Sequence, residues 1–591
     1  MSIALRDALA RLTVPELKDL VSHLPGAETA GRKDQVIERI IVGMLGPGLK
    51  AIWSALDPTQ QAAVAEAAHD PLGEYSEQQF RAKYQRVPSF RVAGAKSHGY
   101  SSSKGSALGL FIHYVRDERR YLIPADLQAR LKAFVPPPAP LSLESSETLA
   151  DDEGLIMRLT EREALQEVVV MLRSIEQARI QVSEKTALPS TAAMRFLTEK
   201  LAGGDFYPWG EKKNKWDQEI GPIKAFAWPM LLQAGALAIR AGGHLALSPA
   251  GVKALSAPPA DVLRGLWRRW LKTTMLDEFS RIEAIKGQNS KGRVMSAVAP
   301  RRAAIEEVLR VCPVGRWVAF AVFSRFMQAS DLIFEVTQDP WKLYVAERQY
   351  GSLGYDGSGG WNILQERYIS AVLFEYAATL GMVDVAYRDP AGARDDFGGL
   401  WGTDELAYLG RYDGMRAFRL TPLGAYVLGL EAGYKPVAIA NNVALSVLPS
   451  LQVTVARGTL GTDETLLLEN WAVQEQAGSW RLDREKALSA IEKGYDIAEL
   501  QGFLESRDEQ PLPELVESFI QKCMRNGTAL KTVGSAVLVE CRDDETAEAI
   551  AGHKETGALC LRAGPKTLVV RTHHLDNFRE RIRLLGFGMA S

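Results

Sequence analysis

The spacing of hydrophobic residues changes several times along the chain, and each change predicts a different set of elements. Between residues 11 and 45, apolar side chains recur every three or four positions, which places them on one face of a helix. Two runs carry this spacing: Leu17, Leu20 and Leu24, and then Val36, Ile37 and Ile40. Thr13 and Glu16 have the spacing of a capping box at the start of the first run. These residues predict a helical pair, and further helix signals continue toward residue 135.

A change in composition follows this helical region. Prolines crowd residues 136–140 and stiffen the chain, and residues 144–153 are rich in acidic side chains. We therefore predict a helical N-terminal domain over residues 1–135 and a linker over residues 136–154.

An internal repeat organises the middle of the chain. Residues 247–255 and residues 420–428 share the pattern Leu-[Ser/Thr]-Pro-x-Gly-x-x-x-Leu. This pattern is typical of a strand end that leads into a capped helix with Pro in its first turn. A helix and two short strands precede each copy, which is the element order of a winged helix. We predict winged-helix domains over residues 155–256 and 301–435, joined by a helical connector over residues 257–300.

Two details of the repeat are specific enough to test. Thr160 and Glu163 have the spacing of a capping box for the first helix of the first copy. In the second copy the two wing strands are separated by residues 388–414, which include Trp401. A loop of this length inside a domain is usually functional or disordered.

Strand-like alternation returns near residue 445, and short capped helices follow it. Asp483 and Asp496 are the predicted caps of two of these helices. From residue 536 onward the pattern reads strand, helix capped by Asp544, strand, strand and amphipathic helix. We predict an α+β domain over residues 440–531 and a βαββα unit over residues 532–591. The expected fold class is therefore a multidomain α+β protein that is mostly α.

The segment from residue 447 to residue 513 resembles the N-terminal, helicase-associated domain of the XPB-type DNA helicases. The matching runs are Val447-Leu448-Pro449, Val453-Thr454-Val455, Trp480-Arg481-Leu482, Lys486-Ala487-Leu488, Glu492-Lys493-Gly494, Phe503-Leu504-Glu505-Ser506 and Leu512-Pro513. Where that family continues Leu-Pro-Gln-Asn, this chain has Leu512-Pro513-Glu514-Leu515, so a contact through the amide side chain is in doubt.

With the βαββα unit behind it, this order is similar to the end of the non-ATPase winged-helix subunit of TFIIH, which docks onto XPB. The resemblance implies that the chain docks on a helicase-type ATPase. The same residues also fit two small α+β domains without that relationship. The β-branched residues that favour strand pairing with a partner are Val537, Val539, Val569 and Val570.

The N-terminal helical pair is similar to the SAP motif, a helix-loop-helix that binds DNA phosphates. The resemblance implies phosphate contacts by four cations near the start of the second helix, because a helix N-terminus and nearby cations both favour anions. These are Lys18, Arg32, Lys33 and Arg39. An ordinary helical hairpin with a solvated basic face explains the same residues.

A second basic segment, residues 286–293, is a further candidate for phosphate contact. Its cations are Lys286, Lys291 and Arg293, and a flexible solvated linker is the alternative interpretation. Upstream, Trp267 and Trp270 lie on a helix among basic residues. Such tryptophans can stack on bases, but this spacing favours a buried position with the cations pointing outward.

Composition restricts the possible partners. The chain has 591 residues, 46% of them hydrophobic, and a net charge of −2, so any phosphate contact must come from local clusters. The cysteines are scattered, which favours reduced, buried thiols and no metal site. No signal peptide and no apolar run near the ~20 residues of a membrane span are visible. We expect a cytoplasmic protein with no membrane partner.

The chain lacks the common sequence motifs of catalysis. The chain has no G-x-x-x-x-G-K-[S/T], no H-E-x-x-H and no G-x-S-x-G. We therefore expect no enzyme activity, no cofactor and no small-molecule substrate.

The first hypothesis is a DNA-binding accessory protein that binds double-stranded DNA and docks on a separate helicase or translocase in DNA repair or anti-phage defence. The alternatives are a nuclease or other DNA-modifying enzyme with an unrecognised active site, and a winged-helix transcription regulator.

Overall fold

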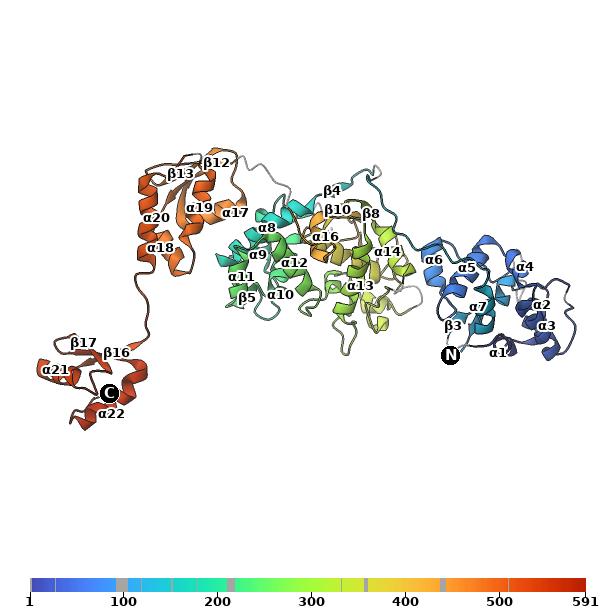
Figure 1. The fold of residues 1–591 in the computed structure, drawn as a ribbon, viewed down its shortest axis with the longest axis horizontal. Helices are drawn as coiled ribbons and strands as arrows, with labels where there is room; N and C mark the ends of the chain where they lie inside the picture. Colours follow the sequence, from blue (N-terminus) through green and yellow to red (C-terminus); the bar gives the residue numbers. More distant parts are fainter. Residues whose placement is uncertain are drawn as a thin grey trace. The chain divides into compact units, whose positions relative to one another are not determined.

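Helices make up 44% of the structure and strands 15%, and the strands form only small sheets (Figure 1). This computed structural model describes residues 3–26, 28–91, 105–117, 119–149, 152–177, 179–209, 218–330, 332–355, 360–435, 443–508 and 510–590. Contacts divide the chain into two units, Met1–Ala438 and Ile439–Ser591. The domain boundary predicted between residues 435 and 440 falls in residues 436–442, outside the described residues. The mixed α+β class expected from the sequence is confirmed at this level.

The first region of unit one is a helical cluster with a small sheet. Its helices are α1 (Leu5–Ala10), α2 (Val14–Val21), α3 (Lys33–Leu45), α4 (Leu49–Ser54), α5 (Pro58–His69), α6 (Glu77–Tyr84), η1 (Ala107–Leu110) and α7 (Ala125–Leu131). The strands β1 (Glu74–Tyr75), β2 (His113–Val115) and β3 (Arg120–Leu122) pair in the order β1-β3-β2. The predicted capping box is confirmed, since Thr13 N donates to Glu16 Oε2 at 2.7 Å. Leu17, Val36 and Ile40 are fully buried in the shared core.

The predicted linker is partly bound to the rest of unit one. Ser146 pairs with Trp317 through two backbone hydrogen bonds of 2.9 and 2.8 Å, and Leu149 packs beside that tryptophan. The strand β4 (Ile156–Arg158) then joins a sheet with strands of the second repeat copy. The segment therefore does not act only as a spacer, because backbone pairing fixes Ser146 and residues 156–158.

The two repeat copies share their element order. The first contains α8 (Thr160–Glu176), α9 (Thr191–Lys200), α10 (Lys224–Ala234), β5 (Ala238–Ala241), β6 (His244–Leu247) and α11 (Pro249–Ala254). The second contains α13 (Val298–Val311), β8 (Trp317–Ala319), α14 (Phe320–Ala329), α15 (Gln365–Ala371), the π-helical η5 (Val372–Ala377), β10 (Val383–Tyr387), β11 (Met415–Leu420) and α16 (Pro422–Leu428). Strand β6 receives a backbone pairing from residues 180–182, and β11 receives the corresponding pairing from β8. The larger sheet has the order β4-β10-β11-β8.

The hydrogen bonds after the two hairpins are the same in both copies. Ser248 Oγ donates to Ala236 O at 2.7 Å, and Thr421 Oγ1 donates to Gly381 O at 2.7 Å. Each hydroxyl also accepts a hydrogen bond from the backbone of its own helix, at 3.0 Å from Gly251 N and 2.9 Å in the second copy. Leu247 and Leu420 end equivalent strands, so the predicted repeat of hairpin and capped helix is confirmed at this level.

One predicted helix cap is wrong. Thr160 Oγ1 donates to Val383 O at 2.7 Å instead of capping α8, and Glu163 binds Arg158 and Lys224. The first turn of α8 is capped by Asp384 of β10, whose Oδ1 accepts from Thr160 N at 2.8 Å. Because the residue before the helix is Leu159, no local side chain can cap it, and a residue 224 positions away does so.

Shorter elements lie between and within the copies. They are α12 (Pro259–Trp270), η2 (Glu278–Arg281), β7 (Ile285–Lys286), η3 (Pro340–Lys342), β9 (Tyr344–Val345) and η4 (Arg348–Tyr350), with β7 paired to β9. Trp267 and Trp270 of α12 are fully buried, as the sequence favoured. Trp270 stacks on Tyr376 with ring centroids 4.2 Å apart.

Unit two begins with the predicted α+β domain. Its elements are β12 (Ala444–Val447), β13 (Gln452–Arg457), α17 (Thr462–Trp471), β14 (Ala472–Gln476), β15 (Ser479–Leu482), α18 (Arg484–Glu492), α19 (Ile497–Arg507) and α20 (Glu514–Gly527). The sheet order is β12-β13-β15-β14. Asp483 and Asp496 cap α18 and α19 through their side chains, at 2.9 Å in both cases, as predicted.

The chain ends in the predicted βαββα order. The elements are β16 (Ala536–Glu540), α21 (Asp544–Gly552), β17 (Cys560–Gly564), β18 (Thr567–Arg571), η6 (Thr572–His574) and α22 (Leu575–Leu584). The cap of α21 is Asp543 rather than the predicted Asp544, because Asp543 Oδ1 accepts from Thr546 N at 2.8 Å. The strand order is β16-β18-β17, which places β18 in the centre.

Candidate nucleic-acid interface

The four predicted cations of the N-terminal helical pair separate into two kinds. Lys33 Nζ donates to Ala10 O at 2.7 Å, and Arg39 Nη1 donates to Glu28 O at 2.6 Å. Both side chains therefore donate hydrogen bonds to backbone carbonyls within the N-terminal region instead of pointing freely into solvent. Lys18 and Arg32 are exposed, and neither forms an ion pair within the described residues. Lys18 of α2 and Arg32, the residue before α3, remain candidates for phosphate contact.

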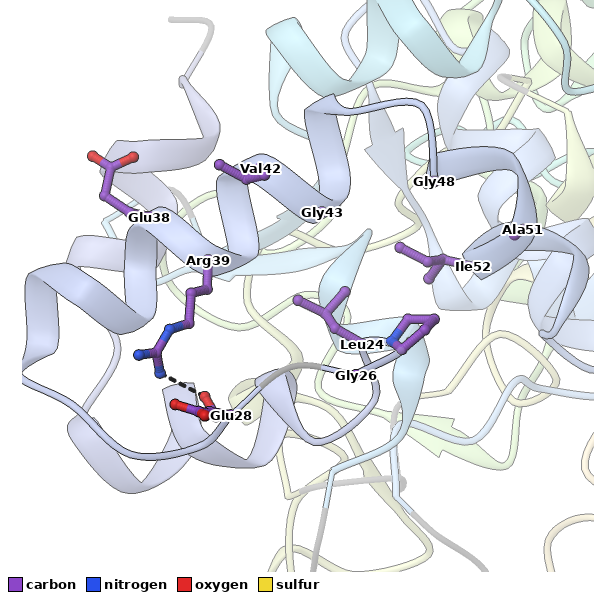
Figure 2. A pocket seen from close by; sticks show the side chains of 11 residues that line it. Leu24, Gly26, Glu28, Glu38, Arg39, Val42, Gly43, Gly48, Ala51 and Ile52 are labelled. Atoms are coloured by element: carbon purple, nitrogen blue, oxygen red, sulfur yellow. Dashed lines mark hydrogen bonds between the residues drawn. The ribbon is translucent and has the colours of Figure 1, made fainter.

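An open groove lies beside this helical pair (Figure 2). It has a volume of about 800 Å³ and lies between α3, α4 and the turn after α2. Leu24 and Ile52 form its floor, and Val42 at its side is 70% exposed. Figure 2 shows Arg39 turned toward Glu28 and away from the apolar floor. This face of the hairpin is apolar with acidic residues at its rim, so it is not a phosphate site.

The second predicted segment, residues 286–293, is a fixed turn rather than a flexible linker. Gln288 Nε2 donates to Ile285 O at 2.8 Å, and β7 pairs with β9 at the start of the turn. At its other end, Gln338 N donates to Val294 O at 2.7 Å. Lys286, Lys291 and Arg293 are all exposed. The turn therefore presents three cations from a backbone that is held at both ends.

Three exposed aromatic rings form a chain of neighbours that begins beside this basic turn, and the sequence pointed to only one of them, Trp401. Trp341 and Tyr355 are each 60% exposed, and Trp401 is 76% exposed. Trp341 and Tyr355 meet edge to face with ring centroids 5.1 Å apart. A Cβ atom placed on Gly351 would lie 3.7 Å from the ring of Trp401, so the segment between Trp341 and Tyr355 passes close to Trp401.

Lys342 connects the rings to the cations. Its Nζ donates to Lys291 O at 2.8 Å, so the residue next to Trp341 is bonded to the basic turn. We call the combination of residues 286–293 with Trp341, Lys342, Tyr355 and Trp401 the aromatic–basic surface. Exposed rings supply stacking faces and exposed cations attract phosphates, which is the composition of many nucleic-acid-binding surfaces.

Ion pairs under the long insertion of the second hairpin hold Trp401 in this place. Arg367 is fully buried and pairs with Asp396 at 2.8 Å and with Asp413 at 3.2 Å. Arg394 pairs with Asp396 at 2.6 Å, and these contacts hold the pKa of Asp396 below its usual value against the effect of burial. Residues 388–414 are therefore ordered, and their exposed tryptophan is carried on a fixed loop. A lone tryptophan in a polar, glycine-rich insertion was the available sequence signal.

A buried polar network joins α12, η2, α13 and α15. Glu278 accepts from Arg302 Nε at 2.6 Å, from Trp270 Nε1 at 2.9 Å and from the Tyr368 hydroxyl at 3.0 Å. Both charged groups of the Glu278–Arg302 pair are fully buried, and burial raises the pKa of Tyr368. Substrate has no access to these groups, so the network positions helices and does not constitute a reactive site.

Neither the cysteine thiols nor the metal-binding types of side chain form a recognisable reactive site among the described residues. Burial raises the pKa of Cys312, Cys523, Cys541 and Cys560, so none is an activated nucleophile. Among the residues that the structure describes, no group of three His, Cys, Asp or Glu side chains is arranged to hold a metal ion. None of the helices in those described ranges is both long and apolar enough to cross a lipid bilayer.

The predicted partner residues of the last unit fall on two strands with different positions. Val537 and Val539 lie on β16, at the edge of the sheet, whereas Val569 and Val570 lie on the central strand β18. Val570 is fully buried under the helices. The backbone groups available for pairing with a partner belong to β16 and β17.

The opposite face of this small sheet is open and apolar. Leu538 and Leu561 are 72% and 69% exposed, and both pair with Val569 across the sheet. The buried core lies on the other side, where α21 and α22 pack. Exposed apolar residues next to one another on neighbouring strands are typical of a protein-interaction surface.

Comparisons with known proteins do not assign the chain to a family. No protein-family model matches the chain, and no similar curated protein is found.

Proposed function

We propose that this protein is a non-enzymatic DNA-binding accessory protein that docks on a separate helicase or translocase, as in DNA repair or anti-phage defence. The observation that carries the DNA part is the aromatic–basic surface. Stacking on an aromatic ring is tolerant of base sequence, and each stacked base is worth about 1–3 kcal/mol. Cations beside the rings supply the salt-dependent attraction to phosphates. The surface thus fits DNA bound without sequence preference, including bases exposed next to a duplex.

The repeat supports this proposal through its element order. Each copy has a helix, a strand segment, two helices, a hairpin and a capped helix, and in each the early segment pairs with the second hairpin strand. That order is the plan of a winged helix, so we propose two winged-helix domains in residues 155–256 and 301–435. In the second one the wing would carry Trp401 on its insertion.

Docking on a helicase is proposed from the last two domains. The resemblance of residues 447–513 to a helicase-associated domain points to that class of partner, and the open face of Leu538, Leu561 and Val569 offers a surface. SAP-like contacts by Lys18 and Arg32 would add duplex binding at the other end of the chain.

The test has two arms. Full-length protein is assayed for binding to duplex, single-stranded and forked DNA and, in parallel, for DNA cleavage and ATP hydrolysis with divalent metal present. Binding without either reaction supports the proposal, whereas cleavage by the pure protein assigns it to the nuclease alternative. The docking arm deletes residues 533–591. Loss of a co-purifying helicase-type ATPase, with DNA binding unchanged, is the expected result, and capture of the same ATPase by the truncated chain contradicts it.

A further inference from the structure

A second groove lies in unit two, within the domain of residues 443–527. The turn between β12 and β13 and the helices α18 and α20 enclose a volume of about 640 Å³. This lies within the usual range of ligand pockets, about 300–1,000 Å³. Its lining residues are Pro449, Ser450, Leu451, Arg484, Leu488, Leu515, Ser518, Phe519, Lys522, Cys523, Arg525 and Asn526. We call it the α18–α20 groove.

The floor of the groove is aliphatic and partly open to solvent. Leu515 at its lip is 61% exposed, and Leu451 and Leu488 are half-buried. Leu451 has a φ of 67°, a conformation that costs a residue with a side chain about 1–3 kcal/mol. Its carbonyl accepts from Leu482 N at 2.8 Å, which holds the turn in this conformation. The residue with the strained backbone, Leu451, is therefore one whose apolar side chain lines the groove.

The charge of the groove is of one sign. Arg484, Lys522 and Arg525 are exposed lining residues, and the lining contains no aspartate or glutamate. None of these three cations forms an ion pair within the part of the chain that the structure describes. Burial raises the pKa of Cys523, and the positive charge of Arg484 partly opposes this rise. The charge of Arg484 therefore acts on a residue that lines the groove. An occupant that brings carboxylates would neutralise an otherwise unbalanced positive rim.

From this arrangement we propose that the α18–α20 groove binds an acidic amphipathic segment of a partner protein. Its apolar side chains would lie on Leu451, Leu488 and Leu515, and its carboxylates would face Arg484, Lys522 and Arg525. A helix or strand with apolar residues on one side and acidic residues beside them has this chemistry. Binding of such a segment requires neither the aromatic–basic surface nor a helicase.

Nucleic acid is the competing occupant of a basic groove, and the lining disfavours it. Base stacking needs exposed aromatic faces, and Phe519, the one aromatic residue among those that line the groove, is only 7% exposed. Aliphatic side chains beside cations match a peptide better than a phosphate backbone. The aromatic–basic surface in unit one has the opposite composition.

The experiment is a selection from a displayed random-peptide library on the full-length protein. We expect the enriched peptides to carry net negative charge with apolar residues between the acidic ones. The same selection on the Arg484→Glu, Lys522→Glu, Arg525→Glu variant should not enrich them. For one selected peptide, fluorescence anisotropy should show affinity at least about tenfold weaker for this variant, and a clear loss for Leu515→Ala.

Matched controls come from the end of α18 and from α20. Lys493→Glu changes an exposed cation that does not line the groove, and Met524→Ala shortens an exposed apolar side chain of α20 that does not line it either. Both should bind the selected peptide like the wild type. The proposal is overturned if no acidic peptide is enriched, if enriched peptides bind the triple variant equally well, or if a scrambled peptide of the same composition binds as tightly. It is also overturned if single-stranded DNA binds the groove and is lost in the triple variant.

Discussion

Trp341 and Tyr355 meet edge to face at the surface of unit one, with ring centroids 5.1 Å apart, although each remains 60% exposed. Ring pairs of this geometry are usually found in cores, where burial supplies most of their stabilisation. Here the segment between the two rings passes close to Trp401, and all three rings remain accessible to solvent. Large apolar side chains that lie together and stay exposed are typical of a binding surface, so the exposure of these rings points to a ligand.

The first prediction concerns these rings. Trp341→Ala with Trp401→Ala should weaken binding of single-stranded or forked DNA by about 30-fold or more, because two stacking faces worth about 1–3 kcal/mol each are lost and about 1.4 kcal/mol is tenfold in affinity. Fluorescence anisotropy with labelled DNA measures the change. Tyr114→Ala is the control, since Tyr114 is 50% exposed on β2 in the N-terminal region. Equal affinity of the double variant and the wild type would assign the rings to another kind of partner.

The second prediction concerns salt dependence. Replacing Lys286, Lys291 and Arg293 by alanine should lower the slope of log affinity against log salt for duplex DNA by roughly two to three. Lys18→Ala with Arg32→Ala should lower it by roughly one to two, because these side chains are exposed and form no ion pairs within the described residues. Lys493→Ala is the matched control. A slope that stays unchanged in both variants would remove these cations from the DNA contact.

Lys33 and Arg39 have a different expected behaviour because their side chains bind backbone carbonyls. Their replacement by alanine should lower the stability of the N-terminal region by about 1 kcal/mol per hydrogen bond, with little change in the salt slope. A loss of stability without a change in salt slope would thus distinguish Lys33 and Arg39 from Lys18 and Arg32, which the sequence placed in the same group.

Sequence patterns located the features that depend on near neighbours. The Thr13–Glu16 capping box, the Ser248 and Thr421 motif and the burial of Trp267 could be predicted, because each depends on spacing within one or two turns. The cap of α8 by Asp384 could not, because the donor and acceptor lie far apart in sequence.

The aromatic–basic surface was missed for the same reason. Its rings and cations come from segments around residues 290, 341, 355 and 401, and no local pattern connects them. The order of the strands in the last sheet also could not be predicted from the sequence. A three-stranded sheet can place any strand in the middle, and only the structure shows that Val569 and Val570 lie on the central one.

The third prediction tests the repeat. A Cβ atom on Gly251 would overlap the carbonyl oxygen of Leu237, and one on Gly424 would overlap that of Met382. Gly251→Ala and Gly424→Ala should each destabilise the protein by about 1–3 kcal/mol, because the hairpin must move away from its helix. Thermal unfolding measures this. Gly265→Ala in α12 is the control: a Cβ atom there meets open space, so it should stabilise by about 0.5–1 kcal/mol. Equal effects at all three positions would contradict the close approach.

The last prediction is a pH dependence in the N-terminal region. His113 is buried on β2, and its burial lowers the pKa to about 4 from an ordinary value of 6.5. Between these values the unfolded chain binds a proton that the folded chain does not, so stability rises with pH across this window. Acidification from pH 7 toward pH 4 should therefore cost at most about 3.5 kcal/mol, because each pH unit between the two pKa values contributes about 1.4 kcal/mol.

Hydrogen exchange of peptides that cover β2 and β3, followed against pH in the full-length protein, measures this loss. His113→Gln removes the titrating group and should flatten the pH dependence between pH 4 and 6.5, whatever its effect on stability at pH 7. His553→Gln, an exposed histidine in unit two, should leave the profile of β2 and β3 unchanged. A profile for His113→Gln with the same slope as the wild type would show that other groups, and not the buried imidazole, make this region acid-sensitive.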